Sequence, residues 1–192
     1  QKDDHWLLGG LPLSLLAKNN QDSWLWRQSF IRAFLERDLP QMGIKTPAVT
    51  LRRFWTMLAH YHGQILNASE LGRAMGVNQT TVANYLDLLD GVFMVRALQP
   101  WHENLKKRQV KRPKVYFRDS GILHSLLGIK DQASLLTHPK IGATWEGYAM
   151  EKTIKKISPD ETYFWATHNG AELDLLLLKD GKKLGYEFKR QD

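Results

Sequence analysis

The sequence predicts an α+β chain in which a mostly helical N-terminal part with a winged helix precedes a smaller unit of one helix and three strands. Three observations support this prediction. Helical periodicity dominates the first half of the chain, a helix-turn-helix pattern and two short strands follow it, and two apolar segments flank Asp180-Gly181 near the end. The expected division is a first domain at 1–128, a linker at 129–142 and a second domain at 143–192.

Two amphipathic helices are expected in the first domain. One covers about Ser23 to Leu39 and stops before Pro40, because proline disrupts a continuing helix. The next begins at Pro47, whose fixed φ suits a first helical turn, and ends at Gly63. Residues with core spacing on these helices are Trp24, Ile31, Phe34, Leu35, Leu51, Phe54, Trp55, Leu58 and His62.

Helix-turn-helix spacing follows. Ser69 can cap a first short helix, Gly76 makes the turn, and Asn78 can cap a second helix that runs from Gln79 to about Leu89. On this second helix, burial is expected for Val82, Tyr85, Leu86 and Leu89, and exposure for Gln79, Thr80, Thr81 and Asn84. Because the exposed positions include no arginine or lysine, we expect contacts with phosphates more than base readout. Such helix pairs also serve as protein-interaction modules.

Two strands, Phe93 to Leu98 and Val115 to Phe117, bracket a basic segment and would form a hairpin wing beside the helices. The segment contains no acid and supplies six of the charges behind the net charge of +7. Its cations are Lys106, Lys107, Arg108, Lys111, Arg112 and Lys114. This concentration of charge is typical of nucleic-acid binding, with DNA favoured, and a solvated basic loop is the alternative.

The second domain is expected to begin with a helix. Asp119 can cap the helix that precedes the linker, and another helix runs from Thr144 to about Lys156. A strand over Thr162 to Ala166 and a turn at His168-Asn169-Gly170 then lead to the last hairpin. Glu146 lies near the first turn of its helix. An acidic side chain at that position interacts favourably with the positive end of the helix dipole, which is sufficient to explain its presence there without a functional role.

The last hairpin is expected to place acids and a lysine on one face. If Asp180-Gly181 forms a type I′ turn, Asp174 lies opposite Glu187, and Glu172 lies opposite Lys189. Facing carboxylates repel each other unless a divalent cation such as Mg²⁺ or Mn²⁺ takes them as ligands. The alternative is an ordinary surface hairpin with a cross-strand ion pair between Glu172 and Lys189.

Composition and missing motifs limit the function classes. The chain has no cysteine, which excludes disulfides and thiolate zinc sites and fits the expected cytoplasmic location. No apolar run reaches the roughly 20 residues of a membrane span, so no membrane partner is expected. Because no Gly-rich loop ends in Gly-Lys-Ser or Gly-Lys-Thr, the chain is not expected to bind or hydrolyse ATP by itself.

Two sets of motifs carry a family resemblance. The first consists of Gly9-Gly10-Leu11-Pro12, Glu36-Arg37-Asp38-Leu39-Pro40-Gln41, the segment Pro113-Lys114-Val115-Tyr116-Phe117-Arg118-Asp119-Ser120-Gly121, Trp145-Glu146 and Glu172-Leu173-Asp174. Together these resemble the domain of unknown function that follows the ATPase module in predicted prokaryotic AAA+ superfamily ATPases. The second is the order helix, strand, strand, strand with Glu146, Asp174 and Glu187-Phe188-Lys189, which resembles the PD-(D/E)XK nuclease core.

The resemblance implies a C-terminal region of a longer protein, with ATP acting only through a preceding ATPase domain. It implies a truncated αβββ restriction-endonuclease-like core in which Glu146, Asp174 and Glu187 hold Mg²⁺ or Mn²⁺ and Lys189 joins Asp174 and Glu187 as a catalytic residue. Two features depart from the family pattern. The chain stops at Asp192 before the usual further helix and strand, and Ala166 follows Trp165 where arginine is common.

Three function classes therefore remain open, and with them the question of whether the chain is an enzyme. The first is a metal-dependent nuclease domain that acts on DNA delivered by the winged helix. The second is a nucleic-acid-binding module built on a catalytically silent nuclease-like scaffold. The third is a protein-interaction module that recruits partners to the ATPase domain.

Overall fold

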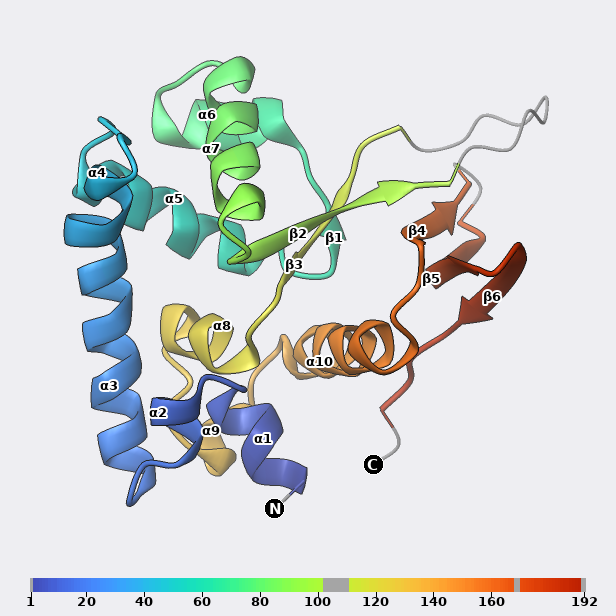
Figure 1. Cartoon of the computed structure of the whole chain (residues 1–192). Coiled ribbons are helices and arrows are strands. Elements are labelled where there is room, and N and C mark those ends of the chain that lie inside the picture. The colour runs from blue at the N-terminus through green and yellow to red at the C-terminus, as the bar shows by residue number, and fades with distance from the viewer. Residues whose placement is uncertain (1, 102–110, 168–169, 191–192) are drawn as a thin grey trace.

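The computed structural model describes residues 2–101, 111–167 and 170–190 (Figure 1). It confirms the α+β class, with N-terminal helices and one mixed sheet of six strands. The first elements are α1 (Lys2–Leu8), α2 (Pro12–Leu15), α3 (Asn20–Ala33), the π-helical segment η1 (Phe34–Asp38), α4 (Leu39–Gln41) and α5 (Ala48–His60). In the described part of the chain, no helix is both long enough and apolar enough to cross a membrane.

The helix that begins with α3 continues through η1 and α4, so the expected stop before Pro40 is wrong. Hydrogen bonds in a π-helix span five residues rather than four, which widens the turn just before the proline ring. The chain leaves the helix only after Gln41, two residues before Gly43, which has a φ of +85°.

The helix-turn-helix pair is present as α6 (Ala68–Met75) and α7 (Gln79–Gly91). Asn78 caps α7 by accepting a hydrogen bond from the N–H of Thr81 at 2.8 Å, and Gly76 has the left-handed conformation expected for the turn. The cap of α6 is Asn67 rather than the expected Ser69, because the helix starts earlier. Ser69 lies inside the first turn and donates its hydroxyl to Gln79 at 2.9 Å.

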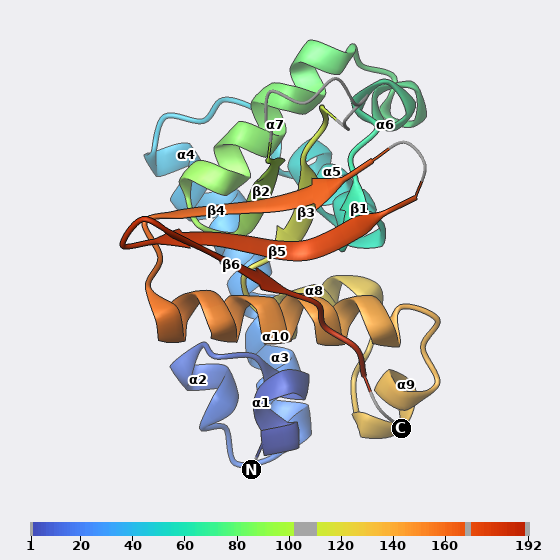
Figure 2. The same ribbon diagram turned by 90° about the vertical axis from the view of Figure 1, so that its right-hand side faces the viewer.

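The sheet joins the two expected domains (Figure 2). Its strands are β1 (Gln64–Ile65), β2 (Val95–Pro100), β3 (Lys114–Phe117), β4 (Glu161–Ala166), β5 (Glu172–Lys179) and β6 (Lys182–Tyr186). They lie in the order β1-β3-β2-β4-β5-β6, and the pairing of β2 with β4 is parallel, whereas all other neighbours are antiparallel. The division at 129–142 therefore separates two groups of strands that share one sheet.

The expected final hairpin is confirmed. Asp180 and Gly181 have φ values of 50° and 73°, as a type I′ turn requires, and Lys179 pairs with Lys182. The ladder between β5 and β6 then continues in the expected register.

Three helices connect the two groups of strands: α8 (Ser120–Leu127), α9 (Gln132–Leu136) and α10 (Ile141–Ile157). Asp119 caps α8 as expected, by accepting a hydrogen bond from the N–H of Ile122 at 2.9 Å. Helix α9 lies within the range expected to be a linker, where Ile129 and Leu135 are buried against α1. An apolar core thus reaches into this range and orders it.

Helix α10 packs against β4 and β5 on one side and against α1 on the other (Figures 1 and 2). Toward the strands it buries Met150 and Ile154 with Phe164, Leu175 and Leu177. The largest core lies among α3, α5, α6, α7, β2, β3 and α8. The position of α10 brings Glu146 close to strand β3.

Candidate functional site

Strand β5 contains an irregularity beside its expected acidic residue. Between Tyr163 and Trp165 the chain of β4 advances two positions, whereas between their partners Leu176 and Leu173 the chain of β5 advances three. The extra residue forms a β-bulge, where the regular alternation of side chains is lost and one side chain is aimed in a new direction. Asp174 lies within this bulge, so alternation along the strand does not determine its face.

Two of the three expected metal ligands, Glu146 and Asp174, interact electrostatically. Burial raises the pKa of Glu146, the hydrogen bond from Tyr116 and the charge of Lys114 oppose this rise, and the charge of Asp174 adds to it. The Asp174 carboxylate accepts a hydrogen bond from the backbone N–H of Phe188 at 2.8 Å. The bulge and helix α10 therefore bring these two carboxylates into one neighbourhood.

Lys114 lies among these carboxylates. Its side chain is 5% exposed, forms a salt bridge with Glu172, and has its Nζ 4.0 Å from Oε1 of Glu146. Burial lowers the pKa of the Lys114 ammonium, and the charges of Glu146 and Asp174 oppose this. The Nζ also lies 5.5 Å from the ring centre of Phe164. We refer to Lys114, Glu146, Glu172 and Asp174 as the carboxylate cluster.

Lys114 was expected to lie in the basic loop, and this expected position is wrong. Strand β3 begins at Lys114 rather than at Val115, and the pairing of Lys114 with Leu98 holds it inside the sheet. A buried side chain that pairs with carboxylates is not available to phosphates. One local signal could have indicated this burial: Lys114 directly precedes the apolar run Val115 to Phe117.

Tyr116 connects the carboxylate cluster to the core. Its buried hydroxyl donates a hydrogen bond to Oε1 of Glu146 at 2.5 Å, and burial raises the pKa of the phenol. Its ring packs edge-on against His62, with ring centres 5.4 Å apart. Helix α10 approaches closely at Gly147, where a Cβ atom would lie 2.3 Å from Nε2 of His62. The glycine after Glu146 thus lets this carboxylate reach β3.

Glu187 and Lys189 lie elsewhere than the regular ladder would place them. Strand β6 ends at Tyr186, and both side chains follow that end. They form an ion pair with each other at 3.2 Å, with side chains 58% and 77% exposed. The expected opposition of Asp174 to Glu187 and of Glu172 to Lys189 is not part of the β5–β6 ladder.

The contacts of the three expected ligands, Glu146, Asp174 and Glu187, show whether their oxygens are arranged to hold the divalent ion that the resemblance implies. Oε1 of Glu146 accepts the Tyr116 hydroxyl and lies near Lys114, Oδ2 of Asp174 accepts a backbone N–H, and Glu187 pairs with Lys189. Within residues 2–101, 111–167 and 170–190, no group of three or more histidine, aspartate or glutamate residues could hold a metal ion. This arrangement fits an internal ammonium better than Mg²⁺ or Mn²⁺.

The other cations of the basic segment precede Lys114 in the chain. Lys111 and Arg112 are exposed just before β3, whereas Lys106, Lys107 and Arg108 lie outside the described residues.

Helix α7 presents a polar surface at its start. Gln79, Thr80 and Asn84 are exposed as expected, whereas Thr81, also expected to be exposed, is half-buried. The hydroxyl of Thr81 donates to the cap residue Asn78 at 3.0 Å. Thr80 and Asn84 are thus exposed polar side chains of α7 that a partner could contact.

The fold and the carboxylate cluster define an α+β region in which a helical part and a three-stranded part share one sheet. The chain belongs to the family of domains of unknown function called DUF8612, whose model matches residues 1–133. A second domain of unknown function, DUF4143, matches residues 141–192. The boundary between the two matches falls inside the range 129–142.

Curated relatives extend this comparison. The uncharacterized proteins Rv2008c of Mycobacterium tuberculosis and Mb2031c of Mycobacterium bovis are each 50% identical to the chain over 188 residues. These alignments cover 98% of the chain but 43% of each relative, so the chain spans less than half the length of the curated relatives it matches. No solved structure matches the chain significantly.

Proposed function

We propose that this chain is the nucleic-acid-binding C-terminal region of a longer AAA+ superfamily ATPase, with a nuclease-like core that serves as a catalytically silent scaffold. The observation that supports the proposal is the order α5-β1-α6-α7-β2-β3 with its β1-β3-β2 pairing, which is the order expected for a winged helix. The sequence between β2 and β3 contains five cations. The ATPase part would lie in the portion of the relatives that this chain does not cover.

Charge supports phosphate binding by the loop. With Lys114 buried, the remaining loop cations are Lys106, Lys107, Arg108, Lys111 and Arg112. Each cation that neutralises a phosphate releases condensed counterions, so the binding constant falls steeply as the salt concentration rises. On duplex DNA, the logarithm of the binding constant falls with the logarithm of the salt concentration with a slope of about 0.9 per phosphate contact. If all five bind phosphates, they account for a slope of roughly 4 to 5.

The carboxylate cluster favours the silent scaffold over the nuclease. Lys114 is buried beside Glu146 and Glu172 and already supplies a positive charge to them. A divalent cation would have to share that space with an ammonium that repels it. Lys189, the expected catalytic lysine, is exposed and paired with Glu187.

The test is duplex binding measured by fluorescence anisotropy over a range of salt concentrations. In the loop variant, all five loop cations are replaced by glutamine. The matched control loses the same charge at exposed lysines elsewhere: Lys18, Lys45, Lys130, Lys156 and Lys182. We expect the loop variant to lose at least about tenfold in affinity and most of its salt slope, and the control to change little. Equal losses in the two variants, or wild-type binding by the loop variant, would refute the proposal.

A metal-dependent phosphodiesterase is the second candidate. It is favoured by the proximity of Glu146 and Asp174, two like charges of the kind that a divalent ion can bridge. Glu187 would be the third ligand and Lys189 the assisting cation, after a rearrangement of the segment that follows β6. This candidate requires cleavage that depends on Mg²⁺ or Mn²⁺ and disappears in Asp174→Asn. A protein-interaction module would show neither DNA binding nor cleavage.

A further inference from the structure

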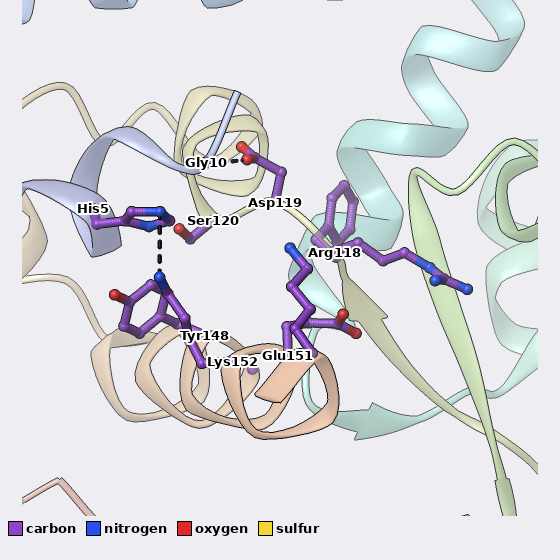
Figure 3. A pocket seen from close by; sticks show the side chains of 11 residues that line it. His5, Gly10, Arg118, Asp119, Ser120, Tyr148, Glu151 and Lys152 are labelled. Carbon is purple, nitrogen blue, oxygen red and sulfur yellow. Dashed lines mark hydrogen bonds between the residues drawn. The ribbon is translucent and has the colours of Figure 1, made fainter. Parts of the chain in front are cut away.

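A pocket of about 340 Å³ lies where the N-terminal helices, the base of the β2–β3 hairpin and helix α10 meet. Its walls come from the links that join α1 to α2, α7 to β2, and β3 to α8, together with β2, α8 and α10. A smaller hollow beside it shares Gly10, Arg118, Asp119 and other lining residues, and Figure 3 shows these side chains. Among the described residues, neither hollow is lined by a member of the carboxylate cluster.

Asp119 fixes one wall of the pocket. Its Oδ2 accepts the N–H of Gly10 at 2.7 Å, which Figure 3 marks, and its Oδ1 accepts the N–H of Ile122 at 2.9 Å. Gly9 has a φ of +80°, and a Cβ atom there would lie 2.2 Å from Oδ1 of Asp119. Two segments more than a hundred residues apart are thus locked together, so this wall exists before any ligand arrives.

Both acidic side chains of the pocket are already satisfied. Asp119 accepts two backbone N–H groups, and Glu151 accepts two hydrogen bonds from Arg96, at 2.5 and 3.1 Å. Each carboxylate thus already has partners within the protein. The acids therefore hold the walls of the pocket in place, and the charge of Glu151 is paired with that of Arg96.

Two cationic side chains remain. Arg118 donates its Nε to the carbonyl of Val95 at 2.9 Å and has a terminal nitrogen 3.6 Å from Asp90, which leaves guanidinium N–H groups for a ligand. Burial and the neighbouring Arg96 lower the pKa of Arg118. Lys155 lines the pocket and is exposed, with no hydrogen bond or ion pair to its ammonium among the residues that the structure describes.

The remaining wall is apolar and includes a strained residue. Leu11, Met94 and Ile122 contribute apolar surface, and Phe93 lies at the edge with its side chain 69% exposed. Phe93 has a φ of 60°, a left-handed conformation that is unfavourable for a bulky residue, and its ring lies 5.1 Å from the Arg118 guanidinium carbon. Such strain persists where the surrounding structure holds it, frequently at ligand sites.

We propose that this pocket binds a small organic acid, with its apolar body against Phe93 and Met94 and its carboxylate paired with Arg118 and Lys155. The guanidinium fork suits a carboxylate, and the volume is near the lower end of ligand pockets, enough for one ring and a short acidic chain. The site is independent of the proposed nucleic-acid contacts.

The test is a titration of the ¹⁵N-labelled chain with 3-phenylpropionate, followed by amide chemical shifts, with the uncharged 3-phenylpropanamide as the matched probe. We expect saturable shifts at Gly10, Met94 and Ile122, and at least about tenfold weaker binding of the amide. Lys155→Gln and Arg118→Gln should each weaken binding of the acid about three- to tenfold, whereas Lys156→Gln should not.

Lys155 is exposed, so its variant keeps the test valid if Arg118→Gln fails to fold. The proposal is overturned if 3-phenylpropionate gives no saturable shifts up to about 10 mM. It is also overturned if the amide binds as well as the acid, or if Lys155→Gln binds the acid like the wild type.

Discussion

Replacing Lys114 with methionine should destabilise the fold, because the substitution removes the buried counter-ion of Glu146 and Glu172. Methionine keeps most of the length and apolar volume of lysine, so the packing against Phe164 is largely retained. The loss should therefore report the charge rather than a cavity.

The size of the expected loss of stability depends on how exposed Lys114 and its two carboxylate partners are. Removing one partner of a fully buried ion pair costs about 3–5 kcal/mol. Lys114 is 5% exposed, but the side chains of Glu146 and Glu172 are 20% and 41% exposed, so water screens the carboxylates in part. The expected loss in the free energy of unfolding at neutral pH is about 2–3 kcal/mol.

The loss should also depend on pH. Burial already raises the pKa of Glu146, and without the opposing charge of Lys114 that pKa rises further. A carboxyl with a raised pKa in the folded state holds its proton more tightly there than in the unfolded state. This tighter proton binding stabilises the folded state fully at pH values below the ordinary pKa of the carboxyl. The stabilisation is lost as pH rises through the raised pKa of the folded state. The Lys114→Met variant should thus lie closer to the wild type at about pH 5 than at about pH 7.5.

Urea denaturation at both pH values measures this effect, with the midpoint and slope fitted for each variant. Lys156→Met, at an exposed position on α10, is the control and should change stability by less than about 0.5 kcal/mol. Adding Glu146→Gln to Lys114→Met should restore part of the loss. A loss below about 0.5 kcal/mol, or one that is the same at both pH values, would refute the role given to Lys114.

Three further substitutions test the packing of the helical part. Gly121→Ala should cost about 1–3 kcal/mol, because the added Cβ would lie 2.1 Å from the carbonyl oxygen of Leu8, whereas Gly142→Ala, with no atom within 4 Å, should not destabilise. Arg27→Met should cost about 2–4 kcal/mol, because the buried guanidinium donates to three serine hydroxyls and a carbonyl on α1, α2, α3 and α8. Burial lowers the pKa of His62 to about 3 in the folded state, so this imidazole is protonated at a higher pH in the unfolded chain than in the folded protein. The free energy of unfolding should therefore fall as pH drops from about 7 to 5, and His62→Gln should make this pH dependence less steep.

Urea denaturation also measures these three effects. The account of the packing is contradicted if Gly121→Ala is as stable as Gly142→Ala, or if Arg27→Met unfolds at the wild-type urea concentration. For His62, the contradicting result is an equally steep pH dependence in the wild type and in His62→Gln.

Features set by neighbouring residues could be predicted from the sequence. The Asp180-Gly181 turn, the Asn78 and Asp119 caps and the turn at Gly76 depend on backbone preferences and contacts within three residues. Helical periodicity likewise located the buried side of α5, because one face of an amphipathic helix must cover the core.

Features that depend on distant contacts could not be predicted in this way. The burial of Lys114 depends on Glu146 and Glu172, which lie far away in the sequence. The bulge at Asp174 arises from the pairing of β5 with β4 and leaves no pattern in the sequence of β5 alone. The parallel pairing of β2 with β4 crosses the expected linker, so the periodicity of either strand says nothing of it. These contacts decide which side chains form the candidate site.

The most direct test of the proposed function follows binding and integrity of one labelled DNA duplex in the same sample, with Mn²⁺ present and salt varied. Our account predicts binding that weakens steeply with salt while the duplex stays intact, in the wild type and in Asp174→Asn alike. Cleavage that requires Mn²⁺ and disappears in Asp174→Asn would contradict the silent scaffold, and the absence of salt-sensitive binding would contradict the nucleic-acid-binding role.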